Sequence, residues 1–431
     1  MLMYNTMLQQ LWFLFVINWI FWSEFALYCI FGDKNQMIEQ LTIRLAKVNV
    51  LYVKVFQAFA VKAFGENTTP ALLKFTDEAP WTDDDVDTVS LELLIQEYNI
   101  ELDKCPIKSG MISLVYKGQV NGAVVAIKIQ RKNIISKLTN GIDNLLFFAK
   151  IVSLLPFIKK FNLVETINKN TGLILEQTIF SNEVSNLNQM REVCKYLKYV
   201  QIPEVFADVT EKYPNIIMME YIVGKPIEQI DPIDRVEFAK QVIKFGIATG
   251  LVHGITHGDL HRGNILFIKN EDVKIKYKLG IIDFGIINTI DPTFRNNMFD
   301  FIGGLFTTTA EESARKFLIS GIIEPVMSIQ SLPKEHYDNI TQIITNILQS
   351  MIDRKREVNQ IEIYNFFRGI NAYLCTNDVI ELGLKPCDGF VKLQLTIAMA
   401  HDVTMSLCGE NYAALLNQVL TEMFHSNLLE M

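Results

Sequence analysis

Two short segments in the second half of the chain combine side chains that phosphoryl transfer requires. Residues 257–264 read HGDLHRGN, and IIDFG follows at 281–285 after a hairpin-like insert. Moving a phosphoryl group from a nucleotide takes a carboxylate near the attacking hydroxyl and oxygen ligands that hold Mg²⁺ on the phosphates. Asp259 is therefore the candidate base, and Asn264 and Asp283 are the candidate Mg²⁺ ligands.

A lysine in an earlier segment completes this set. Lys128 ends the sequence VAIK in the second of two β-branched-rich runs, where a lysine can reach the α- and β-phosphates. The order lysine, Asp-x4-Asn, Asp-Phe-Gly is that of protein-kinase-like folds. Taken singly, Asp-Phe-Gly is a common turn tripeptide, and Asp259 and Asn264 could be loop-capping residues. Three motifs in this order make coincidence the weaker interpretation.

The lysine needs a partner that holds it toward the phosphates. Helical spacing of apolar residues predicts a helix over 173–196, and Glu183 on that helix is the candidate to pair with Lys128. The alternative is an ordinary surface carboxylate, because Glu176 and Glu192 lie on the same predicted element.

Backbone contacts with a nucleotide are predicted at two further places. The sequence MMEY, which ends with Glu220 and Tyr221, is typical of a strand that leads into an inter-lobe hinge whose backbone groups bond adenine; an ordinary buried strand is the alternative. No Gly-x-Gly-x-x-Gly loop precedes the hairpin, where residues 106–111 read PIKSGM. Ser109 and Gly110 remain the phosphate-loop candidates, because a glycine lets backbone N–H groups approach a phosphate.

With these residues in place, the chain resembles the UbiB family of atypical kinases, called ADCK-type in animals and linked to coenzyme Q biosynthesis. The resemblance extends from about residue 40 to about residue 425. It implies an α+β, bilobal protein-kinase-like fold with an N-terminal helical extension and a mostly helical C-lobe. It also implies ATP and Mg²⁺ as cofactors.

Two family elements near the nucleotide are altered. KSGM at 108–111 takes the place of the family's alanine-rich loop. The family's Lys-x-Gly-Gln element, on the helical extension that folds over the active site, is matched by Lys54 and Gln57, with Phe56 in place of the glycine. The resemblance makes Lys54 and Gln57 candidate nucleotide contacts, since their i,i+3 spacing puts them on one helix face.

A third element has lost its charges. The family's Glu-x-Asp falls on residues 177–179, which read QTI, so both acids are missing. The Glu-x-x-Asn element that follows is kept as Glu183 and Asn186. The chain is therefore identified as a divergent member of the family.

Three functions are compatible with this reading of the residues. The leading one is an ATP-binding atypical kinase or ATPase that is membrane-associated and acts in lipid or quinone metabolism rather than on proteins. A pseudokinase scaffold without turnover is the second, favoured by the lost acids. A small-molecule phosphotransferase of the aminoglycoside or choline kinase type, which shares the His-Gly-Asp-Leu-His-x-Gly-Asn loop, is the third. The long N-terminal extension argues against this last one.

The N-terminal segment raises a membrane question. Residues 11–22 are apolar except for Asn18, and 25–31 continue the run, which together approach the ~20 residues that span a bilayer. No Lys or Arg precedes the run, whereas Lys34 and others follow it, so a spanning helix would leave the bulk of the chain on the cytosol-like side. The alternative is a helix packed on the protein or lying in the interface, because Asn18 and Glu24 are costly at the bilayer centre.

Composition sets the outer limits. The chain has 431 residues, a net charge of −8, a pI of about 5.4 and a mean hydropathy of +0.19. No basic face is visible, so nucleic acid is not an expected partner. ATP, a membrane and a lipid or quinone-precursor ligand are the expected partners, and the oligomeric state stays open. Six cysteines without a Cys-x-x-Cys pair indicate a reducing compartment with buried, unpaired thiols.

The pattern divides the chain into four predicted segments. They are a hydrophobic segment at 1–32, a helical extension at 33–105, a kinase-like N-lobe with a helical insert at 106–222 and a helical C-lobe at 223–431. Expected elements are helices over 37–64, 133–155 and 173–196, a hairpin over 112–130 that turns at Asn121-Gly122, a strand over 215–221, apolar runs at 255–267 and 277–283, and helices from Arg295 onward.

Overall fold

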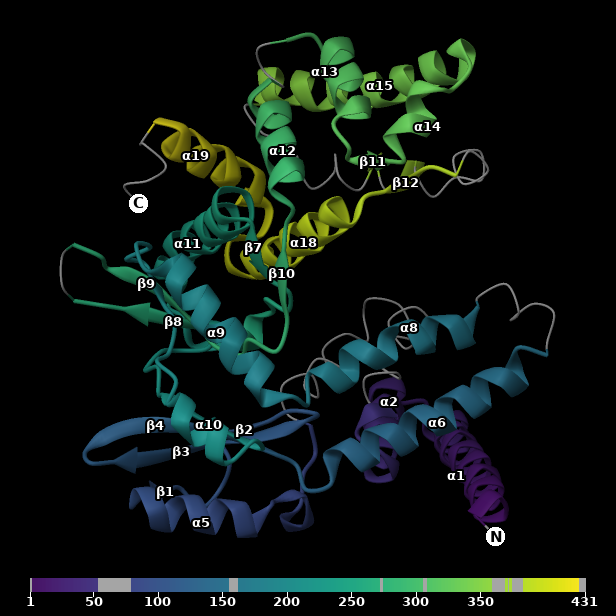
Figure 1. Ribbon diagram of the computed structural model, residues 1–431, viewed down its shortest axis with the longest axis vertical. Helices are drawn as coiled ribbons and strands as arrows, with labels where there is room; N and C mark the ends of the chain where they lie inside the picture. The colour runs from purple at the N-terminus through teal and green to yellow at the C-terminus, as the bar shows by residue number, and fades with distance from the viewer. Residues whose placement is uncertain are drawn as a thin grey trace. The chain divides into compact units, whose positions relative to one another are not determined.

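The computed structural model describes residues 2–52, 79–154, 162–271, 274–304, 308–358, 369–370, 372–373 and 383–425. Internal contacts divide the chain into two compact units, each with strands and helices of its own (Figure 1). The first unit comprises Met1–Val184 and Glu204–Tyr221, and the second comprises Ser185–Pro203 and Ile222–Met431.

The first unit is built on a five-stranded antiparallel sheet. Its strands are β1 (Glu101–Leu102), β2 (Lys108–Ser109), β3 (Ser113–Val120), β4 (Ala123–Gln130) and β6 (Ile216–Glu220). The order is β1-β3-β4-β6, and β2 also pairs with β3. The β3–β4 hairpin turns at Asn121 and Gly122, whose φ angles of 50° and 84° are the two positive values that a type I′ turn needs. The predicted hairpin is confirmed.

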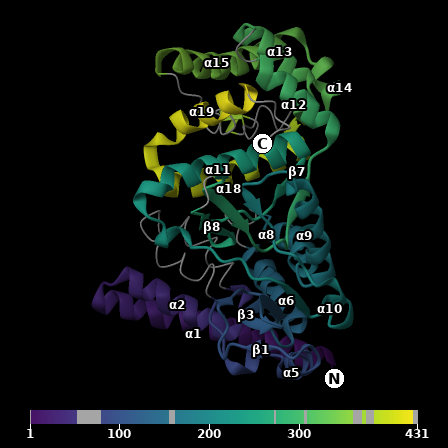
Figure 2. The ribbon, with the colours of Figure 1, turned by 90° about the vertical axis from the view of Figure 1, so that its left-hand side faces the viewer.

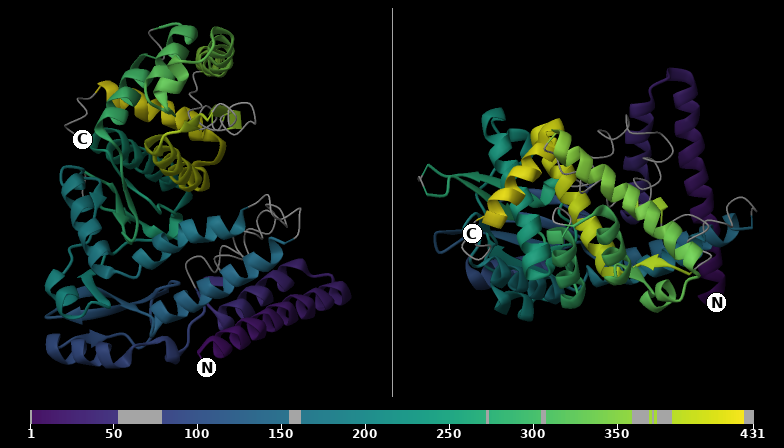
Figure 3. Two further views of the ribbon diagram at one scale, coloured as in Figure 1. Left: turned by 45° about the vertical axis from the view of Figure 1, so that its right-hand side comes forward. Right: turned by 90° about the horizontal axis from the view of Figure 1, so that it is seen from above.

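Some helices of the first unit pack on this sheet, and others form a second cluster beside it. They are α1 (Leu2–Phe31), α2 (Lys34–Val48), α5 (Thr88–Tyr98), α6 (Ile134–Val152), α8 (Leu163–Glu176), the start of α9 (Phe180–Cys194) and α10 (Ala207–Lys212). Apolar residues of α5, α10 and the sheet form one core cluster. A second cluster joins α1, α2, α6 and the start of α9, with Phe13, Ile38, Leu138 and Phe180 among its buried members. The hairpin of α1 and α2 is the pair of purple helices in Figure 3.

Two predicted helices have different bounds in the structure. The helix expected over 37–64 begins earlier and stops at Val48, because Asn49 is extended with φ −162°; residues 53–64 lie outside the described part of the chain. The helix expected over 173–196 is two helices, α8 and α9. They are separated at Gln177–Ile179, where the Thr178 hydroxyl donates to the Leu175 carbonyl of the last turn of α8. The helix expected over 133–155 is confirmed as α6.

The second unit combines small sheets with many helices. Its strands are β5 (Val200–Gln201), β7 (Ile255–His257), β8 (Ile265–Lys269), β9 (Tyr277–Ile281), β10 (Ile287–Thr289), β11 (Ile323–Glu324) and β12 (Lys385–Pro386). They form a sheet β5-β9-β8 and the pairs β7–β10 and β11–β12. The predicted apolar runs around residues 255–283 are thus strands: β7 leads into HGDLHRGN, β8 follows that motif, and β9 leads to Asp-Phe-Gly.

Helices make up most of the rest of this unit. The α-helices are α11 (Arg235–Ile247), α12 (Pro292–Gly304), α13 (Ala310–Ile319), α14 (Val326–Gln330), α15 (Lys334–Val358), α18 (Asp388–Cys408) and α19 (Tyr412–His425). The helices α11 and α18 lie side by side (Figure 2). Among the described residues from Arg295 onward, the expected helices are present beside the β11–β12 pair, and the α+β class with a mostly helical C-terminal part is confirmed. The five described cysteines are unpaired, but Cys29 and Cys105 are exposed rather than buried.

Candidate functional site

Lys128 in β4 forms an ion pair with Glu183 in α9. The distance from Lys128 Nζ to Glu183 Oε1 is 2.6 Å, and the two side chains are only 8% and 5% exposed. The neighbours Ile127 and Ile129 alternate to the other face of the strand and fill the core cluster under α5. The Nζ atom also lies 5.8 Å from the centre of the Phe180 ring. The pairing predicted from the sequence is therefore present, while its role in nucleotide binding stays a prediction.

The predicted phosphate loop is held by contacts within the first unit. The Ser109 hydroxyl is buried and donates to the Ala79 carbonyl at 2.7 Å. The Gly110 N–H donates to the Ser113 carbonyl at 2.8 Å. A Cβ added to Gly110 would make only ordinary van der Waals contact, so the fold itself does not require glycine there. These two residues shape the loop, and their polar groups already have protein partners.

Arg131 fixes this loop, a role that the sequence analysis did not predict. Its guanidinium donates to the carbonyls of Ala79, Pro80 and Gly110, the hydroxyl of Ser109 and the carboxylate of Asp85. Burial lowers the pKa of Arg131, and the neighbouring Asp85 opposes that shift. Because three of its acceptors are backbone carbonyls, residue types along the chain carry no signal for this arrangement.

The predicted hinge strand is β6, and the backbone N–H groups of its last residues are already used. The Glu220 N–H donates to the Glu204 carbonyl at 2.7 Å, and the Tyr221 N–H donates to the Val124 carbonyl at 3.2 Å. Both N–H groups therefore already have backbone partners, and a contact of this strand with adenine stays a prediction. The carbonyl oxygens of these two residues are the backbone groups that remain as candidates for such a contact.

In the second unit, a buried histidine organises the HGDLHRGN segment. His257 is 1% exposed, and its Nε2 lies 2.6 Å from the Asp283 carbonyl. Its Nδ1 accepts a hydrogen bond from the Asp259 N–H at 3.2 Å. A carbonyl can only accept, so the proton resides on Nε2 and the ring is neutral. This agrees with burial, which lowers the pKa of His257.

Asp259 and Asn264 lie on one loop that ends in a 3₁₀ turn at Arg262–Asn264. The Asn264 side-chain amide is buried and donates to the Asp259 carbonyl at 3.0 Å. The Asp259 carboxylate is half exposed, with His261 Nε2 3.7 Å away. The loop thus fixes the Asp259 backbone and leaves its carboxylate accessible to solvent.

Asp283 is held in an unusual backbone conformation. Its φ of 69° is in the left-handed region, which costs most residues about 1–2 kcal/mol but which aspartate visits more readily. Its Oδ1 accepts from the Gly285 N–H at 3.2 Å. Asn186, of the Glu-x-x-Asn element, donates through Nδ2 to the Phe284 carbonyl at 2.9 Å. Hydrogen bonds at three consecutive residues therefore fix the Asp-Phe-Gly segment.

The donor set of the second unit suits Mg²⁺ bound together with a nucleotide. Asp283 and Asn264 offer carboxylate and amide oxygens, which are ligands that Mg²⁺ accepts. Among the described residues no group of three His, Cys, Asp or Glu side chains could hold a metal ion. Because Mg²⁺ commonly takes one or two protein carboxylates plus phosphate oxygens, this set fits a metal that arrives with a phosphate ligand.

Two of the predicted nucleotide contacts lie in a segment that the structure does not describe. Lys54 and Gln57 lie in residues 53–78, outside the described part of the chain. The segment that corresponds to the family's Glu-x-Asp element does lie in the described part of the chain. Ile179, where the family has its second acid, is 48% exposed.

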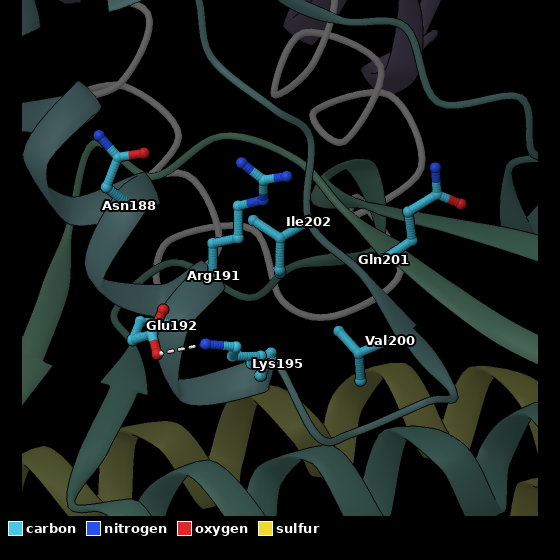
Figure 4. A pocket seen from close by; sticks show the side chains of 8 residues that line it. Asn188, Arg191, Glu192, Lys195, Val200, Gln201 and Ile202 are labelled. Carbon is cyan, nitrogen blue, oxygen red and sulfur yellow. Dashed lines mark hydrogen bonds and ion pairs between the residues drawn. The ribbon is translucent and has the colours of Figure 1, made fainter.

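A hollow of about 560 Å³ in the second unit lies apart from these residues (Figure 4). It is lined by Asn188, Arg191, Glu192, Cys194 and Lys195 of α9 and by Val200, Gln201 and Ile202. None of the predicted site residues lines it. Glu192 and Lys195 pair at 3.2 Å on its edge, as the dashed line shows.

A protein-family model covers the part of the chain that contains the candidate catalytic residues. The model of the ABC1 atypical kinase-like domain matches residues 79–316. The chain therefore belongs to the ABC1 atypical kinase-like family, and the predicted relationship to UbiB/ADCK proteins is confirmed. The matched region contains Lys128, Glu183, Asp259, Asn264 and Asp283.

Individual relatives are distant. The chain is 22% identical over 244 residues to the Arabidopsis thaliana "Protein ACTIVITY OF BC1 COMPLEX KINASE 8, chloroplastic", covering 55% of this chain and 31% of the relative. It is 25% identical over 210 residues to the Xenopus laevis "AarF domain-containing protein kinase 1", covering 47% and 39%. It thus spans less than two thirds of the length of these relatives.

Among solved structures, the chain is similar to that titled "The complex structure of Rv3197-erythromycin from Mycobacterium tuberculosis". The identity is 17%, the TM-score is 0.49, and the likeness covers 86% of this chain and 90% of the other.

Proposed function

We propose that this chain is an atypical kinase or ATPase that uses ATP and Mg²⁺. The observation that carries the proposal is the buried Lys128–Glu183 ion pair. Replacing such a pair by apolar residues of similar size is often neutral or stabilising, so folding alone does not account for it. A role in positioning an ammonium group does. Lys128 would contact the α- and β-phosphates, and Glu183 would hold its Nζ in place.

The acidic residues of the second unit supply the remaining roles. Asp259 would accept the proton of the attacking hydroxyl or water, and its half-exposed carboxylate is accessible for that purpose. Asn264 and Asp283 would hold Mg²⁺, which neutralises charge on the phosphates when it is bound. His257 would be a positioning residue, because it bonds the backbones of both Asp259 and Asp283.

Contacts with the rest of the nucleotide are proposed at the family positions. Ser109 and Gly110 would line the phosphates, and carbonyl oxygens of Glu220 and Tyr221 would face adenine. Lys54 and Gln57 would complete the contacts.

We also propose that the protein associates with a membrane and acts on a lipid or quinone-precursor substrate. In the described residues, one helix, Leu8–Phe31 of α1, is long and apolar enough to cross a bilayer by length and composition. The family resemblance supplies the substrate class.

A thermal-shift titration tests the nucleotide site. The full chain is titrated with ATP, with and without Mg²⁺, beside Asp283→Asn. Asparagine tolerates the left-handed backbone of Asp283, so the variant should fold. A ligand that binds only the folded state stabilises it by about 2.7 kcal/mol at a hundredfold excess over Kd. A Mg²⁺-dependent shift that the variant lacks supports the proposal, and an equal shift in both proteins contradicts the metal role of Asp283.

A scaffold without turnover is the second candidate. The exposed Ile179 favours it, because an isoleucine cannot replace the acid that the family has at this position. Measurement of ATP turnover decides between the two. Turnover that disappears in Asp259→Asn excludes the scaffold, whereas ATP binding without turnover favours it.

A further inference from the structure

The helix α1 is largely apolar, and within the described part of the chain other elements pack on one of its faces. Of the residues Leu8–Phe31, only Phe13, Ile20 and Glu24 are buried. Its exposed side chains include Trp12, Phe15, Trp19, Trp22, Ile30 and Phe31. Four of these, at positions 12, 15, 19 and 22, follow the spacing of a single helix face. A continuous exposed aromatic surface of this length indicates a site that contacts an apolar partner, such as a protein or a membrane.

The opposite face of α1 is part of the core of the first unit. Phe13 and Ile20 are buried with residues of α2 and α6, and the Phe13 ring centre lies 5.2 Å from that of Tyr52. Glu24, the single charged residue of α1, is buried and pairs with Arg44 of α2 at 2.6 Å. The exposed face of α1 therefore carries no charge.

This packing is incompatible with a helix that spans the bilayer. From Phe13 onward α1 packs on the unit, so only the eleven residues Leu2–Trp12 precede the packed region. Eleven residues rise about 16 Å, roughly half of the ~30 Å hydrocarbon core. A spanning orientation would pull α2 into the hydrocarbon with Lys34, Glu39, Arg44 and Lys47.

Two polar side chains in the middle of α1 are bonded to carbonyl groups of the same helix. The Asn18 amide donates to the Leu14 carbonyl at 2.8 Å, and the Ser23 hydroxyl donates to the Trp19 carbonyl at 2.6 Å. Interfaces between proteins usually have a rim of polar groups that form hydrogen bonds with the partner. The exposed aromatic face of α1 has few such groups, so it suits a lipid surface better than a protein. Tryptophan side chains are enriched where hydrocarbon meets headgroups.

We infer that α1 lies in the plane of the membrane, with the face of Trp12, Trp19 and Trp22 immersed in one leaflet and α2 on the water side. A helix in this position sinks about 5–10 Å into the boundary of headgroups and acyl chains. The inference rests on the proposed membrane association and is independent of phosphoryl transfer.

Flotation of the full chain with phosphatidylcholine vesicles is the first test. Trp12→Ser, Trp19→Ser and Trp22→Ser are combined in one variant. The matched control changes three exposed apolar residues of the second unit, Val223→Ser, Ile233→Ser and Met327→Ser. Binding scales with buried apolar area, so the tryptophan variant should lose more than about tenfold in vesicle partitioning while the control keeps it. No flotation of the wild type, or equal loss in the control, overturns the inference.

Depth measurement separates the in-plane helix from a spanning one and does not depend on the triple variant. Three proteins each keep one of Trp12, Trp19 or Trp22, with the other tryptophans changed to Phe, and quenching by brominated lipids gives the depth. In-plane packing predicts the same shallow depth for all three. A spanning helix would separate Trp12 from Trp22 by up to about 15 Å, and that result overturns the inference. The ATP and Mg²⁺ thermal shift of the same proteins reports separately on the proposed function.

Discussion

The two units fix their candidate catalytic side chains by different means. In the first unit, the Lys128 ammonium is nearly inaccessible to water and is held by a carboxylate 2.6 Å away. In the second unit, hydrogen bonds to and from the backbone fix the segments of Asp259 and Asp283, and the Asp259 carboxylate is half exposed. Removal of a charge should therefore damage folding in the first unit and chemistry in the second.

The energetic reason is desolvation. A buried charge that loses its partner stays in a medium of low polarity, which costs several kcal/mol, whereas an exposed carboxylate is solvated by water with or without neighbours.

The largest effect is expected from breaking the pair in the first unit. Glu183→Leu leaves the Lys128 ammonium buried without this carboxylate and should lower the free energy of unfolding by about 3–5 kcal/mol. The double variant with Lys128→Met should recover most of that loss, because neither charge remains. Urea unfolding measures both. A double variant as unstable as the single one would mean that the pair is not the cause.

The next largest effect is expected on turnover. Asp259→Asn should reduce ATP turnover by about 100- to 10,000-fold, the usual range for a general base, with little change in the unfolding free energy. Asp402→Asn, an exposed aspartate of α18, is the matched control. A large loss of stability in Asp259→Asn would show that the second unit also depends on its charge for folding.

A smaller effect is expected from the packing behind Asp259. A Cβ on Gly258 would lie 2.4 Å from Cγ2 of Ile286, so Gly258→Ala should cost about 1–3 kcal/mol through overpacking. Gly172 lies inside α8, and a Cβ added there would meet no other atom within 4 Å. Gly172→Ala should therefore raise the free energy of unfolding by about 0.5–1 kcal/mol. Thermal unfolding of the two variants measures this difference, and opposite signs are the expected result.

The smallest effect concerns acid stability. Burial alone would raise the pKa of Asp85, but the Lys137 hydrogen bond and the Arg131 charge outweigh it and lower the pKa. The ionised Asp85 carboxylate therefore contributes its full stabilisation at pH values above the pKa of an aspartate in the unfolded chain, about 3.9. This contribution is lost as the pH falls below that value. Asp85→Asn leaves the buried Arg131 without this carboxylate, so it should lower the urea midpoint at neutral pH. The further fall of its midpoint between about pH 5 and pH 3 should be flatter than that of the wild type. An unchanged slope would contradict this assignment.

The sequence predicted those parts of the site that depend on side-chain type and order. Lys128 follows from the order of the motifs, Glu183 from its place on a predicted helix, and the Asn121-Gly122 turn from local backbone preferences. The role of Arg131 was not predictable, because its acceptors are largely carbonyls that every residue possesses. Tertiary contacts decide such details.

The same limit explains two other differences. The Glu220 N–H is used because the chain at Glu204 returns beside β6, a pairing that no local pattern announces. The long helix expected over 173–196 is interrupted because the Thr178 hydroxyl bonds the Leu175 carbonyl, which competes with continued helix. His257 could have been found, since a histidine at the end of an apolar run is often buried and needs two partners.

His257 also gives the second unit an internal spectroscopic probe. Its Nε2 is bonded to the carbonyl of Asp283 and its Nδ1 to the N–H of Asp259, so the two ring nitrogens report on different loops. In a ¹⁵N-histidine-labelled protein, a ligand that moves only the Asp-Phe-Gly segment should displace the Nε2 resonance, and one that moves only the loop of Asp259 should displace that of Nδ1. A single ring can therefore show which of the two loops a nucleotide or a metal displaces.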